Sequence, residues 1–340
     1  MKAMVLKEYG KPLVLEEVSK PKIGNAEVLL KVKAAGVCGT DLKIQQGLVP
    51  TKKLPLIPGH EIAGVVEEIG QGVKDFKVSD EVLVSYYVSC GNCRSCLAGR
   101  ETICENLKGR LGFEFNGGFA EYVAVPEACL LPKPSNISFE QAAVVSDAVA
   151  TSYHAFVRRA GIKEGDYLVI VGGGGGLGLH AIQVAQNLGA NIIGIDISDN
   201  KLETMRNLGV KKVLNGQKLD WSKAVFNYTD GRGADYVALF ACTNDTVREG
   251  INSLRKGGKL VFIAYSTEIS FNALKCHLNE IDILSTRAAT RSDIEDSLEL
   301  IREAKVKPII SKILTLEELN DGLALIKNGD LTGRLAVNIK

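Results

Sequence analysis

Short apolar runs, broken by Gly and Pro, fill the first part of the chain. Four of them alternate apolar and polar residues or form brief apolar stretches, which is typical of β-strands. They cover residues 28–32, 61–69, 80–88 and 118–125. The pattern predicts a small, mostly-β, barrel-like domain.

From about residue 166 the pattern changes to strands that alternate with helices. YLVIV at 167–171 predicts a buried strand, and a glycine loop leads into a helical pattern that ends at Gly189, a natural C-cap. Further strands are expected at 191–196, 212–214, 235–240, 259–264 and 281–285. Six strands alternating with helices predict an α/β fold with a doubly wound parallel sheet.

The C-terminal part carries two amphipathic patterns, which predict helices at 292–304 and 316–328. Eight of the nine prolines lie in the first 134 residues, and only Pro308 lies beyond them. Because proline is poorly tolerated inside helices and central strands, the two parts of the chain follow different structural rules. We expect a domain boundary near residue 150.

The bulk composition narrows the possible partners. A chain of 340 residues fits two domains, and no apolar run approaches the roughly eighteen residues of a membrane span. MKAMVLKEYG opens like a strand of the mature protein, so we expect a cytoplasmic location. Lys plus Arg number 41 against 40 for Asp plus Glu, which provides no basic surface for nucleic acid. A small-molecule partner is expected.

The glycine loop is a candidate dinucleotide site. Gly173, Gly175 and Gly178 have the spacing G-x-G-x-x-G, which by itself also suits a flexible loop. The strand before the loop, the helix after it and Asp196 about twenty residues further on favour a nucleotide-binding turn. A carboxylate at Asp196 would bind ribose hydroxyls and repel a 2′-phosphate, which favours NAD over NADP. Lys201 is either a ribose contact or a solvated surface lysine.

Four cysteines form C-x2-C-x2-C-x7-C within CGNCRSCLAGRETIC: Cys90, Cys93, Cys96 and Cys104. Four thiolates at this spacing can close a tetrahedron around Zn²⁺ and leave no position for substrate. A redox pair or a nucleic-acid zinc ribbon is the alternative, but a ribbon needs two separated knuckles and a basic face. We expect a structural zinc site.

Three further fragments offer an open ligand set: Cys38 in GVCGTD, His60 and Glu61 in PGHE, and Asp147 in VVSDAVATSY. A catalytic zinc takes three protein ligands and keeps one exchangeable position. Spacing alone is weak support, because a single Cys or His is more often a core residue.

Taken together, these motifs resemble a known family. GVCGTD, PGHE, the four-cysteine segment, GGFAEY and the glycine loop with its acid follow the order and separations of the zinc-containing medium-chain alcohol dehydrogenases over the whole chain. The resemblance implies a GroES-like catalytic domain at 1–148, a Rossmann NAD-binding domain at 149–285 and a return to the catalytic domain at 286–340. It also implies two zinc ions, NAD and a small alcohol or carbonyl substrate.

The same resemblance assigns roles at the open site. Cys38 and His60 would bind catalytic zinc, and Glu61 would be an exchanging ligand or a neighbour that supports the ligands. Asp147 stands where many relatives have cysteine, and some aspartate, so it is expected to be the third ligand. Thr40 would accept the proton of the substrate hydroxyl.

Further positions follow from the match. The expected cofactor contacts, beyond those named above, are Thr151, Gly176, Leu177, Ala264 and Arg334, with Thr151 and Leu177 near the nicotinamide and Arg334 near the pyrophosphate. The substrate pocket would include Tyr86 and Phe113. Relatives of this size are often homotetramers, so a homo-oligomer, tetramer or dimer, is expected.

Two departures keep other functions open. Relatives often carry a relay histidine three residues after the hydroxyl, whereas this chain has Lys43, and lysine is normally a protonated, poor proton acceptor. VVSDAVATSYHA also resembles branches that act on cyclic-alcohol CoA thioesters or reduce enoyl-CoA. A zinc-independent enoyl-CoA reductase and a non-catalytic binding protein on the same scaffold are the rival interpretations.

Overall fold

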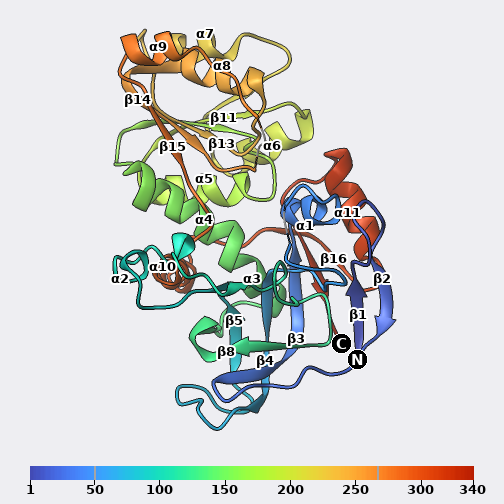
Figure 1. Cartoon of the computed structure of the whole chain (residues 1–340). Coiled ribbons are helices and arrows are strands. Elements are labelled where there is room, and N and C mark those ends of the chain that lie inside the picture. Colours follow the sequence, from blue (N-terminus) through green and yellow to red (C-terminus); the bar gives the residue numbers. More distant parts are fainter. Residues whose placement is uncertain (50, 266–267) are drawn as a thin grey trace. The chain divides into compact units, whose positions relative to one another are not determined.

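The computed structural model describes residues 1–49, 51–265 and 268–340, and these divide into two compact units (Figure 1). Unit 1 comprises Met1–Ala150, Ala289–Arg302 and Pro308–Lys340. Unit 2 comprises Thr151–Ala288 and Glu303–Lys307. Each is described by itself.

Unit 2 is built on a six-stranded sheet with the order β12-β11-β10-β13-β14-β15, and every neighbouring pair is parallel. This order confirms the doubly wound fold. The strands are β10 (Tyr167–Val171), β11 (Asn191–Asp196), β12 (Lys212–Asn215), β13 (Ala234–Leu239), β14 (Leu254–Phe262) and β15 (Asp282–Ser285). The helical segments are α4 (Ala150–Tyr153), η4 (His154–Ala160), α5 (Gly178–Asn187), α6 (Asp199–Asn207), α7 (Trp221–Tyr228), α8 (Asn244–Ser253) and α9 (Ala273–Leu278).

Burial explains why these segments form strands in a parallel sheet. Residues 168–171 of β10 are at most 3% exposed, as expected for a strand covered on both faces. The sequence pattern predicts that this strand begins at residue 259, but strand β14 begins at Leu254. Its first residues, LRKGG, lack an apolar pattern, and the pairing with β13 shifts register between Ala234 and Tyr236. Pattern reasoning therefore missed this irregular start.

Unit 1 contains a seven-stranded sheet. Six of its strands follow the order β16-β17-β3-β4-β5-β9, and the seventh, β8, pairs with β3. These strands are β3 (Glu27–Val37), β4 (Glu61–Ile69), β5 (Glu81–Val84), β8 (Tyr122–Pro126), β9 (Leu130–Pro132), β16 (Ile310–Leu314) and β17 (Arg334–Asn338). Two smaller sheets pair β1 (Lys2–Val5) with β2 (Val14–Glu17) and β6 (Tyr87–Val88) with β7 (Gly109–Arg110).

The helical segments of unit 1 are mostly short. They are α1 (Gly39–Gln45), α2 (Arg94–Leu97), η1 (Glu101–Ile103), η2 (Glu127–Cys129), α3 (Phe139–Val144), η3 (Val145–Val149), α10 (Arg291–Arg302) and α11 (Leu319–Asn328). The predicted C-terminal helices are thus present, but α11 starts three residues later than expected. No helix among the described residues has the length and apolar character needed to cross a membrane.

Two predicted strands of unit 1 are wrong in their bounds. The run 80–88 divides into β5 and β6, and Ser85 and Tyr86 between them belong to neither strand. The run predicted from residue 118 becomes a strand only at Tyr122. Its first residues pack on the turn before β4 instead, where the Gly118 N–H donates to the Gly59 carbonyl at 2.7 Å.

The C-terminal segment completes the sheet of unit 1. Strand β17 pairs antiparallel with β3, and β3 pairs antiparallel with β4; in Figure 1 the red C-terminal end returns to the blue and cyan strands. Gly36 in β3 lies opposite Ala336 on one side and Glu61 on the other. Residues far apart in sequence therefore meet at this point of the sheet.

Candidate functional site

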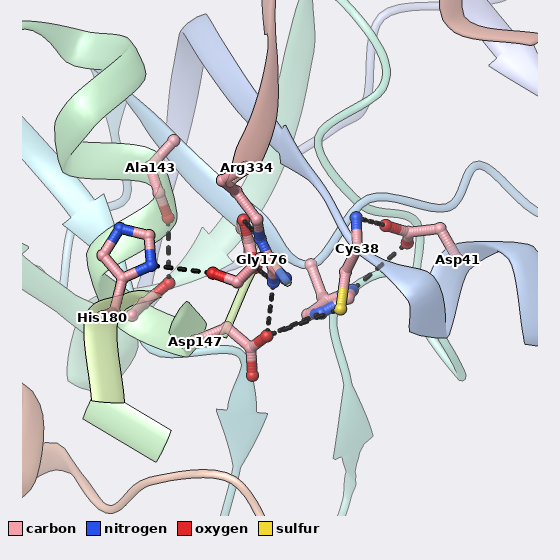
Figure 2. Close-up of polar contacts among 10 residues, drawn as sticks. Cys38, Asp41, Ala143, Asp147, Gly176, His180 and Arg334 are labelled. Carbon is pink, nitrogen blue, oxygen red and sulfur yellow. Dashed lines mark hydrogen bonds and ion pairs between the residues drawn. The ribbon is translucent and has the colours of Figure 1, made fainter. Parts of the chain in front are cut away.

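Four side chains of types that can bind a metal meet in unit 1, and Figure 2 labels two of them, Cys38 and Asp147. Cys38 is the N-cap of α1, His60 and Glu61 lie at the start of β4, and Asp147 lies within η3. One ligand atom from each lies within 4.8 Å of the others, and all four side chains are buried. The structure thus brings together the ligand set that the sequence suggested.

The distances at Asp147 fit a tetrahedral metal ion. Its Oδ2 lies 3.5 Å from Cys38 Sγ and 3.9 Å from His60 Nε2. Zinc–ligand bonds of about 2.0–2.3 Å in a tetrahedron separate neighbouring ligand atoms by roughly 3.3–3.8 Å. Asp147 is 6% exposed and lies inside a helical segment, so it is neither a surface carboxylate nor an N-cap.

Asp41 supports two of these ligands, a role that the sequence reasoning missed. Its Oδ1 lies 3.2 Å from His60 Nδ1, and its Oδ2 accepts the Cys38 backbone N–H at 2.9 Å. A carboxylate acceptor places the proton on Nδ1 and leaves Nε2 for a metal. The signal was present in GVCGTD, where an acid in the first turn of α1 follows the cysteine by three residues.

His60 is held ready to carry a proton when no metal is bound. Burial by itself lowers the pKa of His60, but the charge of Asp41 and hydrogen bonds with Asp147, Asp41 and Cys38 raise the pKa well above its usual value. In the metal-free protein, protonated His60 therefore adds to the free energy of unfolding. This contribution is fully present at low pH and is lost as pH rises through the pKa of His60 in the folded protein. A metal that binds His60 Nε2 must displace this proton, so metal affinity falls as pH is lowered through the pKa of His60.

Arg334 joins the cluster from the first position of β17. Its Nη2 donates to Asp147 Oδ2 at 2.6 Å, and its Nε donates to Glu61 Oε2 at 3.2 Å. Nη2 also contacts Glu61 Oε1. The structure therefore places Arg334 against two of the four ligand candidates, and its expected contact with the cofactor pyrophosphate stays a prediction.

Two aromatic rings pack against the imidazole of His60. The Tyr86 ring lies edge-on at 5.0 Å between centroids, and the Phe113 ring is tilted at 5.3 Å. These are the residues expected to line the substrate pocket. Thr40, the second residue of α1, is partly exposed and lies two positions after Cys38.

The four-cysteine segment forms a second cluster, at 90–104 of unit 1. Its sulfur atoms lie 3.5 Å apart between Cys104 and Cys90 and 3.9 Å apart in the pairs Cys90–Cys96 and Cys93–Cys104. Four thiolates around zinc at about 2.3 Å have their sulfurs about 3.8 Å apart. Backbone N–H groups of Cys96 and Glu105 lower the pKa of the Cys93 thiol to about 6. The donor set and spacing fit a closed zinc site.

In unit 2 the glycine loop connects β10 to α5. A Cβ on Gly178 would lie 2.4 Å from the Gly172 carbonyl oxygen, so glycine is required where α5 packs on the loop. A Cβ on Gly175 would lie 3.3 Å from the Gly172 carbonyl oxygen, which is a tight contact, so glycine suits this position of the loop as well. The Gly176 carbonyl accepts a hydrogen bond from His180 Nδ1 at 2.7 Å (Figure 2). His180 thus orients the loop from within α5.

Asp196 lies at the end of β11 beside this loop. Its Oδ2 accepts the Gly174 N–H at 3.0 Å, and its Oδ1 accepts the Ile197 N–H at 2.8 Å. A carboxylate has about four acceptor positions, so these bonds fix its orientation and leave capacity for a ribose hydroxyl. Lys201 also lies against the loop, because a Cβ on Gly174 would be 2.3 Å from Lys201 Cβ.

The remaining expected cofactor positions also lie in unit 2. Thr151 is 4% exposed in α4, and Leu177 is the N-cap of α5. Ala264 follows β14, and its N–H donates to the Leu239 carbonyl at 3.1 Å. Their contacts with a nicotinamide cofactor stay predictions.

Comparison with known proteins agrees with this arrangement. Residues 24–135 match the family model of the alcohol dehydrogenase GroES-like domain, and residues 176–303 match that of zinc-binding dehydrogenases. An alcohol dehydrogenase of Geobacillus stearothermophilus is 38% identical over the full length of both chains. An acryloyl-coenzyme A reductase of Sulfurisphaera tokodaii is 32% identical over 99% of each. The crystal structure of an NAD-dependent alcohol dehydrogenase superposes with a TM-score of 0.93 at 31% identity, covering 100% of both chains.

Removing one thiolate tests the four-cysteine cluster. Because metal binding there contributes to folding, Cys96→Ser should lower Tm by roughly 5 °C, equivalent to about 2 kcal/mol for a domain of this size. Zinc measured by atomic absorption should fall by one ion per chain. Cys242→Ser, outside both clusters, is the control and should keep the zinc content. Unchanged melting and zinc content in Cys96→Ser would refute a zinc site here.

Asp41→Asn tests whether the Asp41 carboxylate orients the imidazole of His60. It keeps the shape of the side chain but removes the charge that orients the imidazole, so zinc affinity at the Cys38–His60 site should fall about 10–100-fold. Competition with a chelator measures this affinity, and zinc in the four-cysteine cluster serves as the internal control. Wild-type affinity in Asp41→Asn would show that Asp41 only caps α1.

Proposed function

The chain belongs to the zinc-containing medium-chain dehydrogenase/reductase family, and we propose that it is a zinc-dependent alcohol dehydrogenase that transfers hydride between an alcohol, or its carbonyl product, and NAD(H). The observation that carries this proposal is the buried cluster of Cys38, His60 and Asp147, with ligand atoms at distances that suit zinc. Three ligands leave the fourth position for substrate, as in catalytic zinc sites.

The residues of the cluster suggest how the chemistry would be divided. A zinc ion held by Cys38, His60 and Asp147 would supply Lewis acidity, which favours loss of the hydroxyl proton of the alcohol. Asp41 fixes the ring of His60 so that Nε2 faces the ligand set. The hydroxyl of Thr40, two residues from Cys38, would accept the substrate proton and pass it outward.

Unit 2 would hold the nicotinamide cofactor that accepts the hydride. The glycine loop leads directly into α5, whose first backbone N–H groups would bind the pyrophosphate. Asp196 is already oriented by backbone N–H groups, so its carboxylate can accept ribose hydroxyls without reorganising. We propose NAD rather than NADP because this carboxylate would repel a 2′-phosphate.

One relative supports a second candidate. The acryloyl-coenzyme A reductase of Sulfurisphaera tokodaii matches almost the entire chain, so reduction of an enoyl-CoA, or oxidation of a cyclic-alcohol CoA thioester, is the alternative activity. A zinc-independent reductase would not need the Cys38, His60 and Asp147 set. A non-catalytic protein on this scaffold would show no turnover with any substrate.

We further propose that the protein is a homo-oligomer that works in the cytoplasm. Strand β15 ends the parallel sheet of unit 2, and its Ile283 is 37% exposed, while Leu274 and Leu278 of α9 are 64% and 68% exposed. An exposed sheet edge beside apolar side chains suits association with a second copy. Eight cysteines without disulfides suit a reducing compartment.

The proposed function is tested by combining metal analysis with a substrate screen. The purified protein should contain two zinc ions per chain, and NADH absorbance should report turnover with alcohols, polyols or their carbonyl products. One zinc per chain together with turnover of CoA thioesters alone would favour the reductase. Two zinc ions without turnover on any substrate class would favour a binding protein.

Substitutions of Asp147 discriminate a zinc ligand from a structural carboxylate. Asp147→Ala and Asp147→Asn should lose the catalytic zinc and most turnover, since the amide is a weaker ligand without charge. Asp147→Cys should retain the metal because a thiolate is a good zinc ligand. Asp220→Asn is the matched control, since Asp220 is an N-cap whose side chain accepts the Lys223 N–H. Two zinc ions and near-normal turnover in Asp147→Asn would rule out ligation.

Asp196→Ala tests the origin of cofactor preference. Loss of the carboxylate should lower the ratio of kcat/KM for NAD over NADP by about tenfold or more. Asp199→Ala is the control, because the Asp199 carboxylate is paired with Lys218 at 2.8 Å. A wild-type protein that prefers NADP would contradict this role of Asp196.

A further inference from the structure

A cavity of about 960 Å³ lies in unit 1, among residues that the proposed function does not use. Its wall is formed mainly by residues from 18–27, 55–57, 87–89, 108–116 and 122–129, and none of the four ligand candidates lines it. Small-molecule sites in proteins are cavities of roughly 300–1,000 Å³ with mostly apolar walls and a few polar groups. The size of this cavity therefore suits an organic ligand.

Strand β8 forms an apolar part of the wall. Tyr122, Ala124 and Pro126 are alternate residues of the strand, so they lie on one face of the sheet, and all three line the cavity. They are partly exposed, whereas the residues between them are buried in the core. This face of β8 is therefore open to a ligand.

The side chain of Phe115 adds an apolar surface to the wall. Phe115 lines the cavity and is 40% exposed. A Cβ on Gly109 would lie 2.7 Å from Phe115 Cε2, so the ring lies against the backbone next to Lys108. A ligand with an apolar body would remove part of this ring from water, which favours binding.

Two ammonium groups of the wall have no counterion in the described part of the chain. Lys22 and Lys108 line the cavity and are exposed, and neither forms an ion pair with a described residue. The carboxylates of Glu27 and Glu127 line it as well, but backbone N–H groups hold them. Glu27 Oε2 accepts the Gly24 N–H at 2.7 Å, and Glu127 Oε1 accepts two N–H groups at 2.6 Å. An anionic ligand would supply the missing counterion.

The thiol of Cys129, which also lines the cavity, does not offset these charges. Cys129 is 3% exposed, and burial raises the pKa of its thiol to about 12, although the charges of Arg291 and Lys108 act in the opposite direction. The thiol is therefore neutral at pH 7. The effect of Lys108 on it means that this positive charge acts within the cavity.

The cavity is close to the metal cluster but separate from it. Tyr87 lines the cavity, and its ring packs on that of Tyr86 at 4.9 Å between centroids. Tyr86 does not line the cavity, and its ring lies 5.0 Å from that of His60. A ligand in the cavity would thus contact one ring of this pair and leave the metal ligands uncovered.

We propose that this cavity binds an amphipathic carboxylate, a molecule with an apolar chain or ring and one carboxylate group. The apolar body would lie on Phe115 and the open face of β8, and the carboxylate would pair with Lys22 and Lys108. A neutral apolar molecule would leave both ammonium groups unpaired, and a cation would be repelled by them. The proposal depends neither on the zinc site nor on the reaction.

Calorimetric titration of the full-length protein with decanoate tests the proposal. The wild type should bind decanoate, and Lys22→Met and Lys108→Met should each weaken binding about tenfold or more, because each removes a charge-assisted contact. Ala124→Phe should abolish binding by filling the cavity from β8. Lys11→Met is the matched control, since Lys11 is an exposed lysine of unit 1 that does not line the cavity. It should leave the affinity unchanged.

Charge reversal gives a result that misfolding cannot imitate. Decyltrimethylammonium has the same chain length with a positive head group, so the wild type should not bind it. In Lys22→Glu/Lys108→Glu the preference should reverse: decanoate binding is lost, and decyltrimethylammonium binding appears. Because this variant gains a ligand, a folded cavity is required for the expected result.

The remaining arms exclude other sites and other occupants. Cys38→Ser should keep wild-type affinity for decanoate, and loss of binding there would place the carboxylate on the metal and overturn the proposal. So would a wild type that binds no decanoate, or lysine variants with wild-type affinity. If Ala124→Phe dissociates an oligomer in light scattering and the wild type binds no decanoate, the cavity is an interface between copies of the chain.

Discussion

The burial of charged side chains is the constraint on which the structure of unit 1 depends. Asp41, Glu61 and Asp147 are at most 6% exposed, and an ionised carboxylate is too costly to bury without a partner. His60 and the Cys38 backbone supply the partners of Asp41, and Arg334 supplies those of Glu61 and Asp147. Since Arg334 belongs to the last strand, the chain has to return to the first sheet before the cluster is satisfied.

This requirement explains the discontinuous course of unit 1. Strand β17 supplies Arg334, and it lies beside β3 because the two pair antiparallel from Leu335↔Val37 onward. The same strand β3 leads directly into Cys38, and its other neighbour β4 begins with Glu61. Three adjacent strands thus set the positions of the arginine, the cysteine and the glutamate. The sheet therefore contributes side chains to this cluster as well as supporting it.

Parts of the site whose residues are close together in the sequence, or are related by one rule of topology, could be predicted. The four cysteines lie within fifteen residues, so their spacing alone limits how far apart the sulfurs can be. Asp196 ends a strand that pairs with the strand before the glycine loop, and the doubly wound fold places such an acid beside the loop. In both cases local geometry, or one rule of topology, connects the residues.

Features that depend on long-range pairing were not predictable from the same reasoning. Nothing near residue 334 indicates that its guanidinium will lie over Gly36, because this follows from the strand order β17-β3-β4. The support of His60 by Asp41 depends on where α1 meets the start of β4, which hydrophobic periodicity does not determine. The irregular start of β14 was missed because it has no apolar pattern.

The contacts around His60 extend beyond the four side chains that could hold a metal. Phe113 lies beside the imidazole, the Arg110 guanidinium lies 4.0 Å from the Phe113 ring centroid, and Arg110 is paired with Glu114 at 2.7 Å. These contacts restrict the ring, so His60 faces an apolar surface of limited mobility. In the proposed enzyme, such a surface would select substrates by shape, while a metal held by Cys38, His60 and Asp147 would contact only the substrate oxygen.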